Sequence, residues 1–313
     1  MRNFMIILSC MVLLWALPAQ AESHEDFVVE SLGHGIYVHH GAHLDIDDGY
    51  QGDICNISFV VGSKGVAVID SGGSLKVGLQ LRQAIANVTA LPVLYVINTH
   101  VHPDHIYGNA AFLANHDNES EPEFVGHDKL ATAMELRQEQ YAKLNARLLG
   151  EDALGSILVK PSIAVKTTLS LDLGDRQLLL TAHPIAHTHT DLTVMDKQSH
   201  TLFSGDLLFI ERTPVVEGDV KGLIAELEKL KSSGAEQVVP GHGPVSQDAV
   251  LAINNAQTYL QILLNDIRAS IKKGLSMEAT MDTAAATEKD KWLLFDVANR
   301  RNVNTLYPAL EWE

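Results

Sequence analysis

The chain has 313 residues, of which 46% are hydrophobic and 20% are charged, and its formal net charge is −16 at pH 7. This acidity argues against nucleic acid as a partner, because phosphates require patches of Lys and Arg, and also against adhesion to an anionic membrane. The length is large for one compact unit, but a layered α/β fold accommodates it, and no linker-like stretch divides the sequence. We therefore expect one domain that acts on a small-molecule substrate.

Residues 1–21 are typical of a signal peptide for export. Arg2 supplies the positive end, residues 5–17 are apolar, and Ala19-Gln20-Ala21 is an A-x-A cleavage site. The apolar run of about 13 residues is shorter than the roughly 20 that a membrane-spanning helix needs. We therefore predict a mature chain of residues 22–313 that is periplasmic or secreted, with no membrane attachment after cleavage. Its one cysteine, Cys55, is expected to be buried and unreactive.

The first half of the remaining sequence alternates strand and helix patterns. Strands are predicted at 35–38, 57–61, 66–69 and 94–98, with helical spacing at 77–87. A long amphipathic helix is predicted at 129–149. Its expected apolar face consists of Leu130, Met134, Leu136, Tyr141, Leu144 and Leu148.

The second half repeats this pattern. Strands are predicted at 164–171, 177–182, 192–195 and 201–204, followed by an amphipathic helix at 221–232, a strand at 237–240 and a helix at 248–273. A mixed tail completes the chain. Strands in both halves, each half flanked by helices, predict an α/β protein in which two sheets lie between helical layers.

Four potential metal ligands follow the predicted strand at 94–98 within six positions: His100, His102, Asp104 and His105. Residues two apart on an extended backbone point the same way, so His100 and His102 can bind one ion together. Pro103 then bends the chain, and Asp104 and His105 can approach a second ion from another side. Imidazole and carboxylate groups suit zinc and similar cations.

Three further segments offer partners for these residues. His187 precedes the strand at 192–195, Asp206 closes the apolar run that begins at Thr201, and His242 lies in Pro240-Gly241-His242-Gly243. We expect each of them in a loop after a strand, where binding residues on a rigid scaffold collect.

The order and spacing of these elements resemble the metallo-β-lactamase superfamily. The resemblance implies a four-layer αββα sandwich with a C-terminal helical extension. It also implies one metal held by His100, His102 and His187, a second held by Asp104, His105 and His242, and Asp206 bridging the two. The bridging aspartate is similar to the glyoxalase II type of site. Asp70, which ends the strand at 66–69, matches the first family motif and would support the metal-binding loop.

A finer resemblance covers nearly all of the mature chain. The segments around Asp53 and Asn56, together with the tail from Trp292 to Trp312, resemble the exported subgroup called quinoprotein relay system zinc metallohydrolases. The subgroup implies a periplasmic quinoprotein dehydrogenase system as a possible partner.

The implied cofactor is a pair of Zn²⁺ ions, although iron or manganese also suits these ligands. Zinc lowers the pKa of bound water toward about 7, and two ions about 3.5–4 Å apart can share the hydroxide. Our hypothesis is therefore that a metal-bridging hydroxide attacks the carbonyl carbon of an ester, thioester or lactone. Asp104 would orient the hydroxide and shuttle its proton.

Three other functions fit the same ligands: hydrolysis of a β-lactam, an iron-dependent sulfur dioxygenase with a single iron, and a non-catalytic metal-binding partner of a quinoprotein dehydrogenase. The complete ligand set favours an enzyme. No G-x-S-x-G elbow, P-loop or G-x-G-x-x-G sequence indicates another chemistry.

Some residues outside the ligand set are weaker candidates for contact with substrate or ligands. His43 follows the first predicted strand in a loop that overhangs the site in the superfamily, and His127 precedes the long helix. Arg212 could pair with a substrate carboxylate through its planar fork, although a structural salt bridge is the simpler interpretation. His189 is offset from His187 along the chain and is expected at the surface or behind the ligands.

Overall fold

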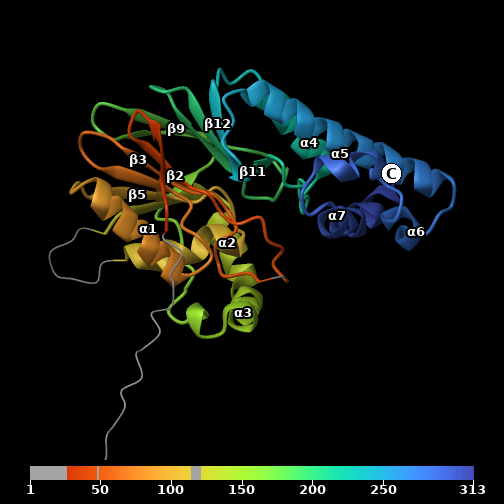
Figure 1. Ribbon diagram of the computed structural model, residues 1–313, viewed down its shortest axis with the longest axis horizontal. Helices are drawn as coiled ribbons and strands as arrows, with labels where there is room; N and C mark the ends of the chain where they lie inside the picture. Colours follow the sequence, from red (N-terminus) through yellow and green to blue (C-terminus); the bar gives the residue numbers. More distant parts are fainter. Residues whose placement is uncertain (1–26, 48, 114–120) are drawn as a thin grey trace, which may run out of the picture.

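Two β-sheets lie face to face between helices in the computed structural model, which describes residues 27–47, 49–113 and 121–313 (Figure 1). The predicted signal peptide at 1–21 lies outside the described residues. The first sheet has the strand order β1-β2-β3-β4-β5-β6-β7 and the second has the order β12-β11-β10-β9-β8. The strands are β1 (Glu30–Gly33), β2 (Ile36–His39), β3 (Ile57–Val61), β4 (Val66–Ile69), β5 (Val93–Ile97), β6 (Glu123–His127), β7 (Ile163–Val165), β8 (Thr168–Asp172), β9 (Gln177–Ala182), β10 (Leu192–Asp196), β11 (Thr201–Phe209) and β12 (Gln237–His242).

Alternating side chains on the central strands create three apolar layers. In β4, Val66 and Val68 point to the outer face of the first sheet, whereas Ala67 and Ile69 point to the second sheet. In β12, Val239 faces the first sheet and Val238 faces the helices. Because side chains on a strand alternate with a period of two, each buried sheet contributes to two cores. This produces the αββα order expected for the chain.

Helix α1 (Leu75–Val88) covers the outer face of the first sheet. It begins at Ser74, whose hydroxyl accepts a hydrogen bond from the backbone N–H of Val77 and so satisfies a free donor of the first turn. Leu81 and Ile85 are buried against that sheet. Short helix α2 (Pro103–Ile106), η1 (Tyr107–Phe112) and long helix α3 (Leu130–Leu149) follow, and η2 (Gly150–Ala153) continues from α3.

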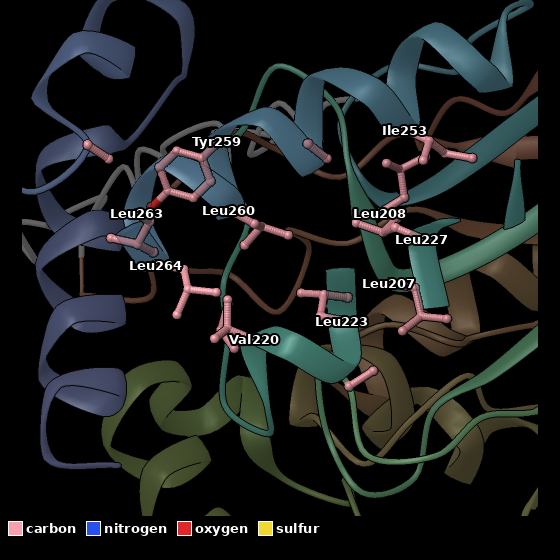
Figure 2. Packing of buried hydrophobic residues seen from close by; sticks show 14 of the residues in the cluster. Leu207, Leu208, Val220, Leu223, Leu227, Ile253, Tyr259, Leu260, Leu263 and Leu264 are labelled. Carbon is pink, nitrogen blue, oxygen red and sulfur yellow. The ribbon is translucent and has the colours of Figure 1, made fainter. Parts of the chain in front are cut away.

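Helices α4 (Val220–Leu230) and α5 (Ala249–Lys272) cover the second sheet. Figure 2 shows Leu207 and Leu208 of β11 facing Leu223 and Leu227 of α4 and Ile253 of α5. The C-terminal extension consists of α6 (Met277–Met281), η3 (Ala286–Lys291) and α7 (Phe295–Leu310), and it packs against α5 (Figure 1). Among the described residues, no helix is both long and apolar enough to span a bilayer.

The structure differs from the prediction at two strands and one helix face, and it adds two strands. The run at 164–171 is two strands in different sheets, β7 and β8, because the chain crosses between the sheets at 166–167. Leu136 was predicted on the buried face of α3, but it is 79% exposed, since it lies off the stripe formed by Leu130, Met134 and Tyr141. Strands β1 and β6 carry too little apolar alternation to have been predicted. Strand β11 continues to Phe209, five residues beyond its predicted end.

Candidate metal centre

The predicted ligands come from β11, from the end of β12 and from the segments that follow β5 and β9. His100 and His102 follow β5, and His105 lies in α2, which begins at Pro103. Asp206 and His242 were expected in loops after strands, but they lie inside β11 and at the last position of β12. The register of β11 shifts on both sides of Gly205. Such an irregularity can redirect a side chain, here that of Asp206, out of the regular ladder.

Three histidines and one carboxylate converge in the first group. The Nδ1 atom of His102 lies 3.0 Å from His100 Nε2 and 3.1 Å from His187 Nε2. Oδ2 of Asp206 lies 3.3 Å from His187 Nε2 and 3.7 Å from His100 Nε2. These four ligand atoms are close enough to bind one ion. His100, His102 and His187 are therefore brought together as the sequence predicts.

The second group shares Asp206 with the first. Nε2 of His105 lies 3.3 Å from Asp206 Oδ1 and 3.6 Å from Asp104 Oδ2. Nε2 of His242 lies 3.4 Å from Asp206 Oδ2 and 3.5 Å from Asp104 Oδ2. Asp206 thus faces both groups, which is the arrangement expected of a bridging carboxylate.

The residues in this cluster fit a metal ion. Nε2 of His105 and Oδ1 of Asp206 are fully buried and have no hydrogen-bond partner in the part of the chain that the structure describes. Leaving such a group unpaired costs about 1–3 kcal/mol, and more for a charged group. A cation between these atoms would remove that cost, and imidazole and carboxylate donors suit zinc and other borderline divalent ions.

Backbone carbonyls and a buried carboxylate orient the rings. His187 Nδ1 donates to the carbonyl oxygen of Val215 at 2.8 Å, and His242 Nδ1 donates to that of Ile54 at 2.7 Å. A carbonyl only accepts, so each ring carries its proton on Nδ1 and directs the Nε2 lone pair into the cluster.

Asp70 has the supporting position that the resemblance implied. Its Oδ2 lies 2.8 Å from His105 Nδ1 and accepts from Thr99 Oγ1 at 2.7 Å, and Oδ1 accepts from the Thr99 backbone N–H. The Thr99 hydroxyl in turn lies 3.0 Å from His100 Nδ1. Asp70 adopts a φ of 56°, a backbone conformation that costs energy outside glycine and concentrates at functional sites.

Glu217 is a site residue that the sequence analysis missed. Its Oε2 lies 2.9 Å from Nε2 of His102, so a carboxylate faces one side of the ring while Nδ1 faces the other ligands. The charge on His102 lowers the pKa of Glu217 to about 2. A glutamate in an irregular loop carries no sequence signal, and only the folded chain brings it to His102.

The charges in the cluster are strongly coupled. Burial opposes ionisation of Asp206, but the charges of His242, His105 and His100 hold its pKa well below its usual range. Burial also opposes protonation of His187, yet the Asp206 carboxylate raises the pKa of His187 to about 9. Because a cation must displace these protons, metal binding should weaken as the pH falls.

Cys55 is buried as expected, at 1% exposure, but it lies beside the cluster. Its Sγ donates to the backbone carbonyl of Asp104 at 2.9 Å, and burial raises the pKa of the thiol to about 12. The side chain packs with Ile57 and Phe59 of β3 and lies close to Asp104 and His105.

The weaker candidates occupy different surroundings. His127 lies outside both groups, because Nε2 donates to the His183 carbonyl at 3.2 Å and Nδ1 accepts from the Lys129 backbone N–H at 3.0 Å. His43 lines a groove of about 390 Å³ beside Gly243, and His189 is exposed. Arg212 is buried with Nη1 unpartnered, so the structural salt bridge considered for it is absent among the described residues.

Residues 50–242 match the family described as the metallo-beta-lactamase superfamily. The chain is 29% and 30% identical to the acyl-coenzyme A thioesterase MBLAC2 of Bos taurus and of Homo sapiens, over 64% of this chain and 80% of each relative. The solved structure of a metallo-beta-lactamase from Pontibacter korlensis aligns with a TM-score of 0.60 at 19% identity, over 75% of this chain and 98% of that one. The sec-alkylsulfatase Pisa1 from Pseudomonas sp. aligns with a TM-score of 0.65 at 14% identity, over 90% of this chain, which spans half of the sulfatase's length.

Proposed function

The chain belongs to the metallo-beta-lactamase superfamily, and from this we propose that it is an exported dinuclear zinc hydrolase that cleaves a thioester, ester or lactone. The observation that carries the proposal is the position of Asp206 between two groups of ligands, each with its own histidines. A single-metal enzyme needs neither His242 nor Asp104 at this position. The thioester is placed first because relatives at 29% and 30% identity are named acyl-coenzyme A thioesterases.

Each side chain has a defined task in this proposal. His100, His102 and His187 would hold one cation, Asp104, His105 and His242 the other, and Asp206 both. When bound, the two cations would supply a water of lowered pKa and a Lewis acid for the carbonyl oxygen. Asp104 Oδ2 lies near His105 and His242 on the least buried ligand of the second group, with 13% of its side chain exposed. Because part of its carboxylate is open to solvent, Asp104 could accept a proton from the reacting water.

Substitution of ligands tests the proposal. His102→Ala and Asp206→Ala should each lose bound metal and hydrolysis together, whereas His189→Ala, a change at an exposed neighbour of His187, should retain both. Metal content by elemental analysis and turnover of a panel of thioesters, esters and lactones are the measurements. Full activity in either ligand variant would refute the proposal.

The same measurements separate the other functions. Two zinc ions per chain with thioester turnover would support the proposed enzyme. Iron or manganese in both positions with the same turnover would change the identity of the metal and leave the proposed hydrolysis unchanged. Nitrocefin as the preferred substrate would identify a β-lactamase. One iron per chain with oxygen consumption would identify a sulfur dioxygenase, and full metal without turnover would favour a binding role.

Export and the subgroup with a quinoprotein dehydrogenase system remain part of the proposal, and the N-terminal pattern and the motifs around Asp53 and Trp292 support them. Expression of the full chain in a bacterial host should yield a periplasmic protein that begins at Glu22, as measured by intact mass. A cytoplasmic, uncleaved product would contradict export. Co-purification with a periplasmic quinoprotein dehydrogenase would test the partner.

A further inference from the structure

Arg212 is a buried cation that forms no ion pair with any residue that the structure describes. The residue is 8% exposed, its Nη1 is fully buried without a hydrogen bond, and its guanidinium forms no ion pair within residues 27–47, 49–113 and 121–313. Burying a charged group without a partner is costly. The position therefore needs an explanation other than stability.

A second buried arginine shows what a structural role looks like in this chain. Arg176 is 4% exposed, and its Nη2 lies 3.1 Å from Asp196 Oδ2 while Nη1 donates to the Val61 carbonyl at 3.1 Å. Arg212 has no equivalent of either contact. The two guanidinium groups are similarly buried, and only one of them is paired.

The guanidinium of Arg212 lies within the electric field of the metal centre. Burial lowers its pKa, and the carboxylates opposing that effect are those of Asp104 and Asp206, followed by Asp45. The same charge reaches His43, whose pKa is lowered by partial burial and by Arg212. The backbone fixes this location, because the N–H of Ile210, two residues before Arg212, donates to the carbonyl of His242 at 3.1 Å, and Glu211 lines the same groove as His43.

A strained turn directs Arg212 into this position. The backbone N–H of Arg212 donates to the Ile210 carbonyl at 2.7 Å, and Glu211 between them has a φ of 62°. This three-residue γ-turn with a positive φ is rare and strained, and such strain persists only where the surrounding structure enforces it.

The C-terminal extension supplies the contacts that enforce the turn. The backbone N–H of Leu293 donates to the Glu211 carbonyl at 2.7 Å, and that of Thr213 donates to the Leu293 carbonyl at 3.0 Å. Leu293 lies between η3 and α7, beyond the residues that match the family, 50–242. The chain thus uses its own extension to hold an unpaired arginine beside the metal centre.

We propose that Arg212 binds a carboxylate of the substrate, so that the substrate is an acid whose carboxylate lies close to the carbonyl group that is hydrolysed. A planar guanidinium binds a carboxylate through two parallel hydrogen bonds, and this anion would satisfy Nη1. The assignment of substrate class rests on the proposed hydrolase function. It favours half-thioesters and half-esters of dicarboxylic acids over simple acyl-coenzyme A, whose charges lie far from the thioester.

Two matched pairs of probes test the anion site on the zinc-loaded mature protein. The first pair is succinate and its monoamide, succinamate, compared by calorimetry; both retain one carboxylate for the metal centre. The second pair is the succinyl and succinamoyl thioesters of N-acetylcysteamine, compared by kcat/KM. We expect the charged member to be preferred about 10–100-fold in each pair, as for a charge-assisted bidentate contact. In Arg212→Gln both preferences should disappear, with metal content unchanged.

Two further variants serve as controls. Arg300→Gln, a change at an exposed arginine paired with Asp282, should keep the preference. Arg212→Lys should retain part of it, and it replaces Arg212→Gln if that variant does not fold. The wild-type comparison alone is also decisive, because equal affinity for succinate and succinamate overturns the proposal.

The possible failures are distinguishable. A binding preference that depends on Arg212, without turnover of any thioester, supports the anion site and refutes the hydrolase. Turnover without a preference for the charged substrate supports the hydrolase and refutes the anion site. Tighter binding of sulfate and phosphate than of succinate would overturn the assignment of a carboxylate.

Discussion

Asn302 of α7 holds the loop that orients His187, a candidate metal ligand, and its replacement should weaken metal binding from a distance. Its side chain is fully buried, with Nδ2 donating to the Pro214 carbonyl at 2.7 Å and Oδ1 accepting from the Val216 backbone N–H at 2.9 Å. Between these two positions, the carbonyl of Val215 accepts from His187 Nδ1 at 2.8 Å. Asn302→Ala should therefore free the carbonyl that fixes the ring of His187.

The magnitude follows from the bonds that are lost. Asn302 Nδ2 also donates to the Tyr259 hydroxyl at 2.9 Å, so the alanine variant removes three hydrogen bonds and leaves buried backbone groups unpaired. With a net value of about 1 kcal/mol per bond and about 1–3 kcal/mol for a buried unpaired group, the free energy of unfolding should fall by about 3–5 kcal/mol. Loss of a residue that orients a ligand should lower metal affinity by about 10–100-fold.

Urea unfolding of the metal-free protein and competition with a chelator measure the two effects separately. Asn304→Ala is the matched control, because Asn304 is an exposed asparagine on the same helix and its loss should change neither quantity. If Asn302→Ala lowers stability but leaves metal affinity at the wild-type value, Asn302 does not control the orientation of His187 through the Val215 carbonyl. If both quantities are unchanged, the hydrogen bonds described for Asn302 contribute nothing.

Three other changes have defined outcomes. Glu217→Gln should lower metal affinity by about 10-fold, because the carboxylate lies 2.9 Å from His102 Nε2. This is the low end of the range for a residue that orients a ligand, since Glu217 is half exposed. Unchanged metal affinity in competition with a chelator would contradict this role. Leu208→Ala, at a fully buried position between β11 and α5, should reduce the free energy of unfolding by about 2–5 kcal/mol, and a loss under 1 kcal/mol in urea titration would show that the layer is loosely packed. Burial raises the pKa of Glu226, but its contacts with His183 and Lys229 together outweigh this and hold the pKa below its usual 4.5. The stability that the charged carboxylate provides is present above that pH and lost in acid. Glu226→Gln should therefore destabilise the protein at neutral pH and much less in acid, and an equal effect at both would refute the charge as its cause.

Sequence patterns predicted the elements best where they are local. Strand β3 at Ile57–Val61 and strand β4 at Val66–Ile69 have the predicted bounds, because an apolar run bounded by turn residues is a local signal. The run at 164–171 failed because one apolar pattern continues through the crossing from the first sheet to the second. Only pairing with β6 and with β9 shows where that run divides.

The candidate ligands were identifiable from the sequence alone, because histidine and aspartate are typical metal-binding residues and their order and spacing resemble a known family. How they are held was not identifiable. The Ile54 carbonyl that orients His242 lies 188 positions away in sequence. Neither the approach of Glu217 to His102 nor the lack of an ion pair at Arg212 among the described residues leaves any trace in a local sequence pattern. Ligand identity depends on the chemistry of single side chains, whereas ring orientation, unpaired charge and strain depend on which distant segments meet, and folding alone decides that.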